Sequence, residues 1–292
     1  MVWARRTVAD STWFVARRVA GRKYLLTPHP AMTATFWYLL GVYAEKHGLL
    51  LHAIVMMSNH LHYVVTAPDQ VISEFMADLH REMGRVVNKR FEQRGAMFED
   101  DEPSRVEVVG ERGAVDRVLY TVMNPVKAGL VERSELWPGM RWIPGMRELT
   151  AKRPENGFEA DLWPDEVTMH FTAPPAWTGT EDQWHDEIAR LVAEEEGALR
   201  KERIRTGRAV LGAQLVKDQD PFGSPRTKPD KSDINPMLAT GGDGPLMRRL
   251  IAELKAWRRA YRDALERWKH DKSVSFPVGT YWMVVHHGAN CG

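Results

Sequence analysis

The chain has 292 residues, and its 40 lysines and arginines are balanced by 39 aspartates and glutamates, so the net charge of +1 does not by itself indicate a nucleic-acid partner. Its single cysteine, Cys291, excludes disulfide frameworks, zinc fingers and iron–sulfur clusters, and is typical of a reducing cytoplasm. No apolar run reaches the roughly 18 residues that a membrane span needs, and the N-terminus lacks an apolar signal segment. We therefore expect a cytoplasmic protein of about two domains, with no membrane partner.

The first half of the chain shows clear strand and helix periods. Alternating and helical apolar spacings predict a strand over 11–19, a helix over 31–47, strands over 49–57 and 60–66, a helix over 72–91, a strand over 104–109 and a helix over 114–123. Ser58-Asn59 is turn chemistry, so the second and third strands form a hairpin. Asn124-Pro125 is expected to end or kink the last helix.

The second half is less regular. No long period survives between 139 and 175, and a helix is predicted over 181–208. Residues 218–244 are rich in Pro, Gly, Lys and Asp, which is typical of a linker. A helix over 246–269 and a strand-like tail over 276–285 follow. From 246 to 272 there are nine basic and four acidic residues, which makes either a solvated charged face or an accessory surface for DNA phosphates.

Two histidines in the third predicted strand could share a metal ion. His60 and His62 project from the same face of that strand, about 6 to 7 Å apart along the chain. Two imidazoles at this spacing can bind one divalent ion, although the spacing alone also suits two strand histidines without a ligand. We interpret His52, on the preceding strand, as a core or supporting residue.

Tyr120 and Asn124 lie four residues apart on one face of a predicted helix. Taken alone, Tyr120 is most simply a core or interface residue, and Asn124 before Pro125 is most simply a helix-end residue.

The two constellations together resemble a known family. The strand Met56-Met57-Ser58-Asn59-His60-Leu61-His62-Tyr63-Val64-Val65 resembles the histidine–hydrophobic–histidine strand of the HUH single-tyrosine transposases. About sixty residues later, Tyr120-Thr121-Val122-Met123-Asn124-Pro125-Val126-Lys127-Ala128-Gly129-Leu130-Val131 resembles their tyrosine helix, in the form found in REP-associated tyrosine transposases. The resemblance covers about residues 5–138.

This resemblance implies a fold and a division of the chain. We expect an α+β fold in which helices flank an antiparallel sheet, as in the ferredoxin-like core of HUH nucleases, with a mainly helical C-terminal extension. The predicted domains are a catalytic domain over 1–138, a Pro/Trp-rich connection and charged helix over 139–217, a flexible linker over 218–244, and a basic helix and tail over 245–292.

The resemblance also implies a site. His60 and His62 match the family's metal ligands, Tyr120 matches its nucleophile, and Asn124 is placed to be a third ligand of a divalent ion, Mg²⁺ or Mn²⁺. The implied activity is that of a DNA strand transferase and endonuclease that cuts and rejoins single-stranded DNA through a covalent 5′-phosphotyrosine.

Single-stranded or hairpin DNA is the expected partner, and the sequence leaves open whether the protein is a monomer or a homodimer. Basic side chains chosen as DNA-binding candidates are Arg17, Arg18, Arg22, Lys23, Lys89, Arg90, Lys127, Arg258, Arg259 and Arg262.

Two alternatives stay open. The acidic run from Glu99 to Glu102 repels phosphate and favours a domesticated DNA-binding protein without turnover. Another HUH nuclease, a replication initiator or a relaxase, is disfavoured by the Asn124-Pro125-Val126 sequence.

Overall fold

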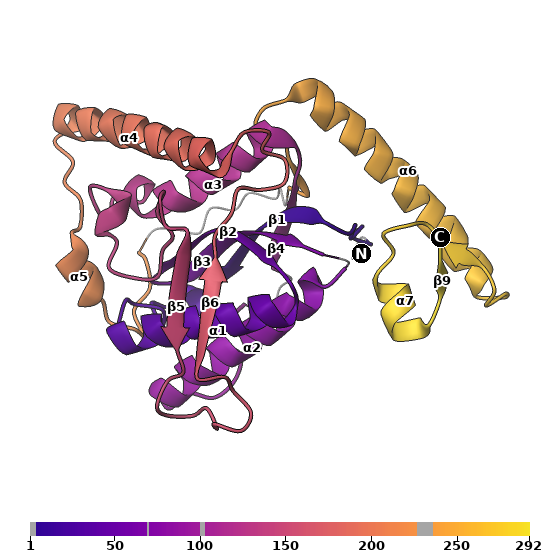
Figure 1. The fold of residues 1–292 in the computed structure, drawn as a ribbon, viewed down its shortest axis with the longest axis horizontal. Helices are drawn as coiled ribbons and strands as arrows, with labels where there is room; N and C mark the ends of the chain where they lie inside the picture. Colours follow the sequence, from indigo (N-terminus) through magenta and orange to yellow (C-terminus); the bar gives the residue numbers. More distant parts are fainter. Residues whose placement is uncertain (1–3, 69, 100–102, 227–235) are drawn as a thin grey trace.

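The computed structural model describes residues 4–68, 70–99, 103–226 and 236–292. Its centre is a five-stranded sheet in the order β2-β3-β1-β4-β7 (Figure 1). The strands are β1 (Ser11–Arg18), β2 (Leu50–Met57), β3 (His60–Ala67), β4 (Ser104–Val108) and β7 (Leu238–Ala239). All neighbours pair antiparallel except β4 and β7. The expected α+β fold with helices on an antiparallel sheet is confirmed.

Strand register places the histidine pair. Ala16 lies opposite His62 and Arg18 lies opposite His60. Because directly paired residues project from the same face of a sheet, the side chains of Phe14, Ala16 and Arg18 share a face with the two histidines.

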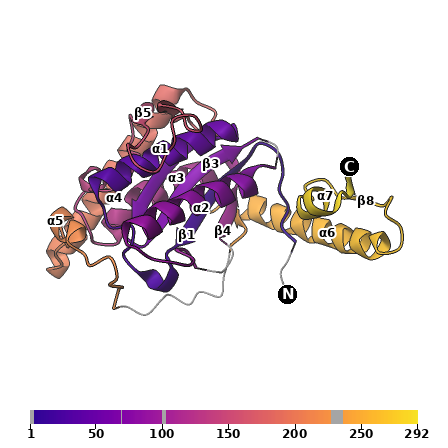
Figure 2. The same ribbon diagram turned by 90° about the horizontal axis from the view of Figure 1, so that it is seen from below.

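Helices cover both faces of the sheet (Figure 2). On one face lie α1 (Pro30–Lys46) and α2 (Ile72–Arg90), where the Phe75 ring meets the edge of Tyr63 from β3. The other face is covered by α3 (Gly110–Lys127), which packs on β2, β3 and β4.

The helix α3 is longer than the sequence predicted. It begins at Gly110 and runs to Lys127 with Pro125 inside it, so the expectation that the helix would end at Asn124-Pro125 was wrong. Proline in the last turn removes one backbone N–H without stopping the turn, and Ala128 N still donates to the Asn124 carbonyl at 3.0 Å.

Residues beyond 138 pack on the same core. A hairpin of β5 (Glu148–Lys152) and β6 (Glu166–His170), which the sequence did not predict, lies on α1, where Gly41 lets Val167 approach closely. The helix α4 (Glu181–Thr206) packs along α3, and the short α5 (Ala213–Lys217) follows. The buried side chains of Trp137, Trp142 and Trp184 join the strands in one apolar core.

The β2 edge of the sheet is paired within the chain, and β7 covers the end of β4. On β2, the Met56 N–H donates to the Met140 carbonyl at 2.9 Å, and Trp142 and Thr172 donate to β2 carbonyls at 2.8 and 2.9 Å. On β4, the strand β7 comes from the stretch 218–244 that the sequence predicted as a linker. Residues 227–235 of that stretch, and 100–102 of the acidic run, lie outside the described residues.

The C-terminal segment forms a module to one side of the sheet (Figures 1 and 2). It consists of α6 (Gly244–Trp268), β8 (Ser275–Phe276), α7 (Trp282–His287) and β9 (Asn290–Cys291), with its own small core around Phe276 and Met283. The predicted strand over 276–285 was wrong: one helical turn brings Trp282 onto His286, with ring centroids 4.0 Å apart, and Gly288 (φ 61°) ends the helix. Within the described residues, no helix combines the length and the apolar character needed to cross a membrane.

Candidate catalytic site

Four predicted site residues, from β3 and α3, meet on the sheet face that α3 covers. The ring centroids of His60 and His62 are 4.7 Å apart, and those of His62 and Tyr120 are 5.6 Å apart with planes at 80°. The Asn124 side chain hydrogen-bonds His60. Two segments sixty residues apart in sequence therefore form one cluster.

Phe14 from β1 completes the packing of this cluster. Its ring stacks on His62, and its edge faces Tyr120 with centroids 5.6 Å apart. Sequence reasoning missed Phe14; the available signal was the alternation along β1, but the register with β3 was needed to place it beside His62.

Both imidazoles of the cluster are neutral at pH 7. Burial lowers the pKa of His60 to about 4, helped by Arg18 and Arg22 and opposed by the hydrogen bond to Asn124. Burial, His60 and the nearby Arg18 and Arg117 guanidinium groups hold the pKa of His62 well below its ordinary value. The neutral imidazole is the form that binds metal ions.

The donor atoms fit a divalent ion. His60 Nδ1 lies 2.7 Å from Asn59 Oδ1, and in the tautomer in which Nδ1 donates to this oxygen, Nε2 carries the lone pair. Nδ1 of His62 is buried and has no hydrogen-bond partner among the described residues. The same residues contain no group of three His, Cys, Asp or Glu able to hold a metal ion. The donors that the cluster could offer a divalent ion are two imidazoles and the amide of Asn124.

Cations surround the tyrosine. The Arg117 guanidinium carbon lies 5.5 Å from the ring centroids of both Phe14 and Tyr120. Lys127 Nζ lies 5.9 Å from the Tyr120 centroid and forms a 2.7 Å ion pair with Glu195 of α4. Sequence reasoning missed Arg117, although its position one helical turn before Tyr120 was a usable signal.

The other predicted DNA-binding residues are dispersed. Arg17 projects from the opposite sheet face and lies over the Phe98 ring at 5.3 Å. Arg22 is near His60, whereas Lys89 and Arg90 are at the end of α2. Lys23 follows the short helical turn over 20–22. Arg258, Arg259 and Arg262 lie on α6, away from the cluster.

His52 belongs to the core, as the sequence interpretation had it. Its side chain is fully buried, with Nδ1 2.8 Å from the Thr172 carbonyl and Nε2 2.8 Å from Thr66 Oγ1.

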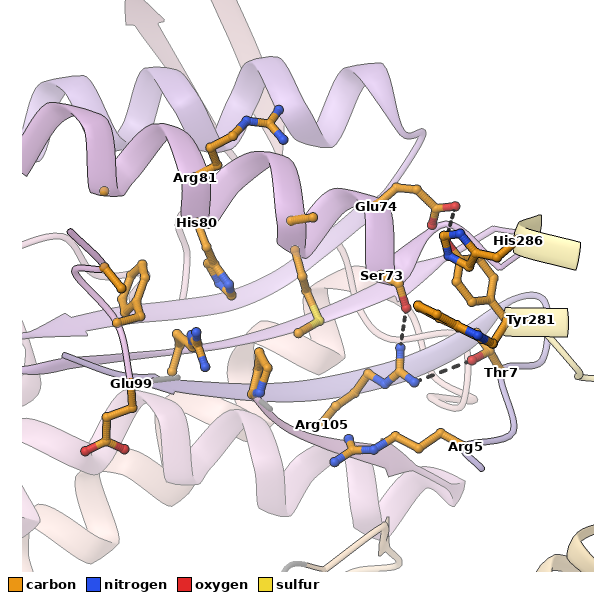
Figure 3. A pocket seen from close by; sticks show the side chains of 18 of the residues that line it. Arg5, Thr7, Ser73, Glu74, His80, Arg81, Glu99, Arg105, Tyr281 and His286 are labelled. Atoms are coloured by element: carbon orange, nitrogen blue, oxygen red, sulfur yellow. Dashed lines mark hydrogen bonds between the residues drawn. The ribbon is translucent and has the colours of Figure 1, made fainter. Parts of the chain in front are cut away.

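A groove of about 1540 Å³ lies on the opposite face, between α2, the sheet and the C-terminal module (Figure 3). Its arginines already have partners: Arg105 donates to Ser73 Oγ at 2.9 Å, Arg81 pairs with Asp78 at 2.6 Å and Arg85 with Glu82 at 2.6 Å. Because it contains none of the four clustered residues, the cluster is the better candidate for catalysis.

Comparison with known proteins finds a similarity in the first part of the chain. Residues 15–101 match the family model described as "Transposase IS200 like", a span that includes both histidines. This part of the chain is therefore similar to IS200-like transposases. No curated protein matches the chain.

Two solved structures are similar to the chain. One is a REP-associated tyrosine transposase bound to a REP hairpin, which is 17% identical, with 48% of this chain and 81% of that chain covered and a TM-score of 0.42. The other, from Deinococcus radiodurans R1 and provisionally assigned as a transposase, is 20% identical, with 38% and 88% covered and a TM-score of 0.28.

Proposed function

We propose that the chain is an IS200-like transposase that cuts and rejoins single-stranded DNA through a covalent 5′-phosphotyrosine on Tyr120. His60, His62 and Asn124 would hold a divalent ion, Mg²⁺ or Mn²⁺. The observation that carries the proposal is the contact between Tyr120 and His62, which brings a hydroxyl nucleophile beside a pair of neutral imidazoles.

The reaction exchanges one phosphodiester for another. Tyr120 Oη bonds to the phosphorus, the bond from phosphorus to the 3′ oxygen breaks, and the phenolic proton ends on the released 3′-hydroxyl. A bound divalent ion supplies Lewis acidity, which stabilises charge developing on the phosphate. Attack by another strand's 3′-hydroxyl reverses the step and restores Tyr120, so that rejoining needs no ATP.

The contacts of the chain support this role for each residue. Phe14 restricts the rotation of His62 and the position of Tyr120, because its ring touches both. Asn59 fixes the His60 tautomer that keeps Nε2 available. The alternative of a DNA-binding protein without turnover keeps the same fold and differs only in the outcome of a cleavage assay.

The test is covalent capture. Single-stranded oligonucleotides that tile the DNA flanking the gene carry a 3′ label, and are incubated with protein and Mg²⁺ or Mn²⁺. Wild type should form a labelled adduct that survives denaturation, and Tyr120→Phe should lose it while still binding DNA. Tyr261→Phe, on α6, is the matched control and should react normally.

Undiminished adduct in Tyr120→Phe would overturn the nucleophile assignment. DNA binding by wild type without any adduct in either metal would support the alternative without turnover.

A further inference from the structure

We propose that Arg117 is a phosphate-binding residue of the catalytic site and that it couples the binding of the divalent ion to the binding of DNA. The inference rests on the proposed function for the identity of the metal ligands. It adds a residue and a thermodynamic property that neither the family match nor the histidine–tyrosine pattern contains.

The position of Arg117 is set by three elements. It precedes Tyr120 by one turn of α3, so the two side chains lie on the same face of the helix. Its guanidinium carbon is equally far, 5.5 Å, from the rings of Phe14 on β1 and Tyr120. Its charge also acts on His62 of β3. Arg117 therefore lies beside both the proposed nucleophile and the imidazole pair, where a phosphate attacked by Tyr120 would be within its reach.

The charged groups that act most on the imidazole pair are arginines. Arg18 and Arg22 act on His60, and Arg18 and Arg117 act on His62, although Arg117 is also paired with Asp116. Coulomb repulsion from these guanidinium groups opposes a divalent cation in the DNA-free protein. A DNA phosphate offsets that repulsion and contributes an anionic oxygen, so that each ligand should strengthen the binding of the other by the same factor.

The guanidinium group of Arg117 already holds an anion. Nε and Nη2 donate to Asp116 Oδ2 at 2.9 and 2.6 Å. The Asp116 side chain is 47% exposed, so the pair is open to solvent and to exchange. A carboxylate and a phosphate present similar oxygens to the arginine fork. A DNA phosphate could therefore take the place of the Asp116 carboxylate on Arg117. Lys127, in contrast, is paired with another helix through Glu195.

The experiment measures Mn²⁺ affinity and does not need turnover. Free Mn²⁺ is followed by electron paramagnetic resonance in the Tyr120→Phe protein, with and without a 20-nucleotide oligothymidylate. The oligonucleotide should raise Mn²⁺ affinity about tenfold or more, the factor expected for one charge-assisted contact. Adding His62→Ala measures Mn²⁺ held by the DNA alone.

Three further changes in the Tyr120→Phe protein test Arg117, and a fourth is a control. Arg117→Gln should lose most of the increase that DNA causes, without weakening Mn²⁺ binding in its absence. Arg117→Lys should keep part of the increase, which guards against a folding defect in the Gln variant. Asp116→Asn should strengthen oligonucleotide binding, because it frees the fork. Arg112→Gln, at an exposed arginine on the same helix, should behave like the parent.

Equal Mn²⁺ affinity with and without oligonucleotide in the parent would overturn the coupling. A full DNA-dependent increase in Arg117→Gln would overturn the residue assignment. If Tyr120 is not the nucleophile, the capture assay reports it, and the Mn²⁺ measurement is unaffected.

Discussion

The ring of Phe14 lies nearly parallel to the imidazole of His62, with centroids 5.3 Å apart and planes at 16°. This stack joins β1 to the histidine strand on the face where α3 brings Tyr120. The candidate site is thus built from three elements, and its geometry depends on the packing of α3 against the sheet.

Asn124 offers a direct test of the ligand set. Asn124→Asp keeps the size of the side chain and adds a negative charge among cations, so it should raise Mn²⁺ affinity in the absence of DNA by about tenfold. Asn124→Ala should lower that affinity. Isothermal titration in the Tyr120→Phe protein measures both, and unchanged affinities would remove Asn124 from the metal site.

The absence of a side chain at Gly113 should be needed for the close packing of β7 on α3. A Cβ added there would lie 2.7 Å from the Ala239 carbonyl oxygen of β7, so Gly113→Ala should lower the free energy of unfolding by roughly 1–3 kcal/mol. Gly84→Ala is the matched control on α2, because its nearest neighbour, Met97 Cβ, is at 3.7 Å. The control should be neutral or stabilising by about 0.5–1 kcal/mol in urea unfolding. Equal stability of the two variants would contradict tight docking of β7.

His52 should make stability depend on pH. Burial lowers its pKa to about 4, so between pH 6.5 and 4 the unfolded state binds more protons than the folded state. Its contribution is complete above pH 6.5 and is lost as pH falls, which amounts to about 2 kcal/mol at pH 5.

The free energy of unfolding, measured with urea at pH 7 and at pH 5, should therefore fall less in His52→Gln than in wild type. This holds whatever the stability of the variant at pH 7. Thr168→Val, at an exposed β6 residue without a titratable group, should keep the wild-type change. If His52→Gln loses as much stability between pH 7 and pH 5 as wild type does, His52 is not the source of the pH dependence.

The basic face of α6 should contribute to DNA affinity through Arg259 and Arg262, which are exposed. Replacing both with Gln should reduce the slope of log affinity against log salt by about 1.4, at roughly 0.7 for each single-strand phosphate that the protein no longer neutralises. Arg258 is the internal comparison, because it is partly buried and donates to Met237 Sδ. Identical slopes in wild type and the double variant would leave α6 as a solvated charged surface.

The sequence predicted the elements whose pattern is local. The strands and helices up to β4 contain apolar runs or periods that can be read locally, so their bounds agree within a few residues, although β2 and β3 are buried on both faces. The hairpin of β5 and β6 escaped notice because each strand has only five residues and β5 buries only Ala151. The tail was misassigned because Val284-Val285 has strand-like composition but lies in a helix.

The residues of the candidate site also divide into those that belong to a local sequence pattern and those that only the fold brings there. The histidine pair and Tyr120 belong to short sequence patterns, so the sequence was enough to single them out. Phe14 and Arg117 have no such pattern, and their place at the site depends on strand register and on how α3 crosses the sheet.

The strip of chain hydrogen-bonded along β2 has a consequence for self-association. Met140, Trp142 and Thr172 occupy backbone groups that an edge strand would otherwise offer to another molecule. An exposed edge of this kind is a template for amyloid-like stacking and for intermolecular strand addition. While residues 139–172 stay docked, a second copy has no ladder to extend along β2, and release of this strip would be the step that exposes the protein to aggregation from that edge.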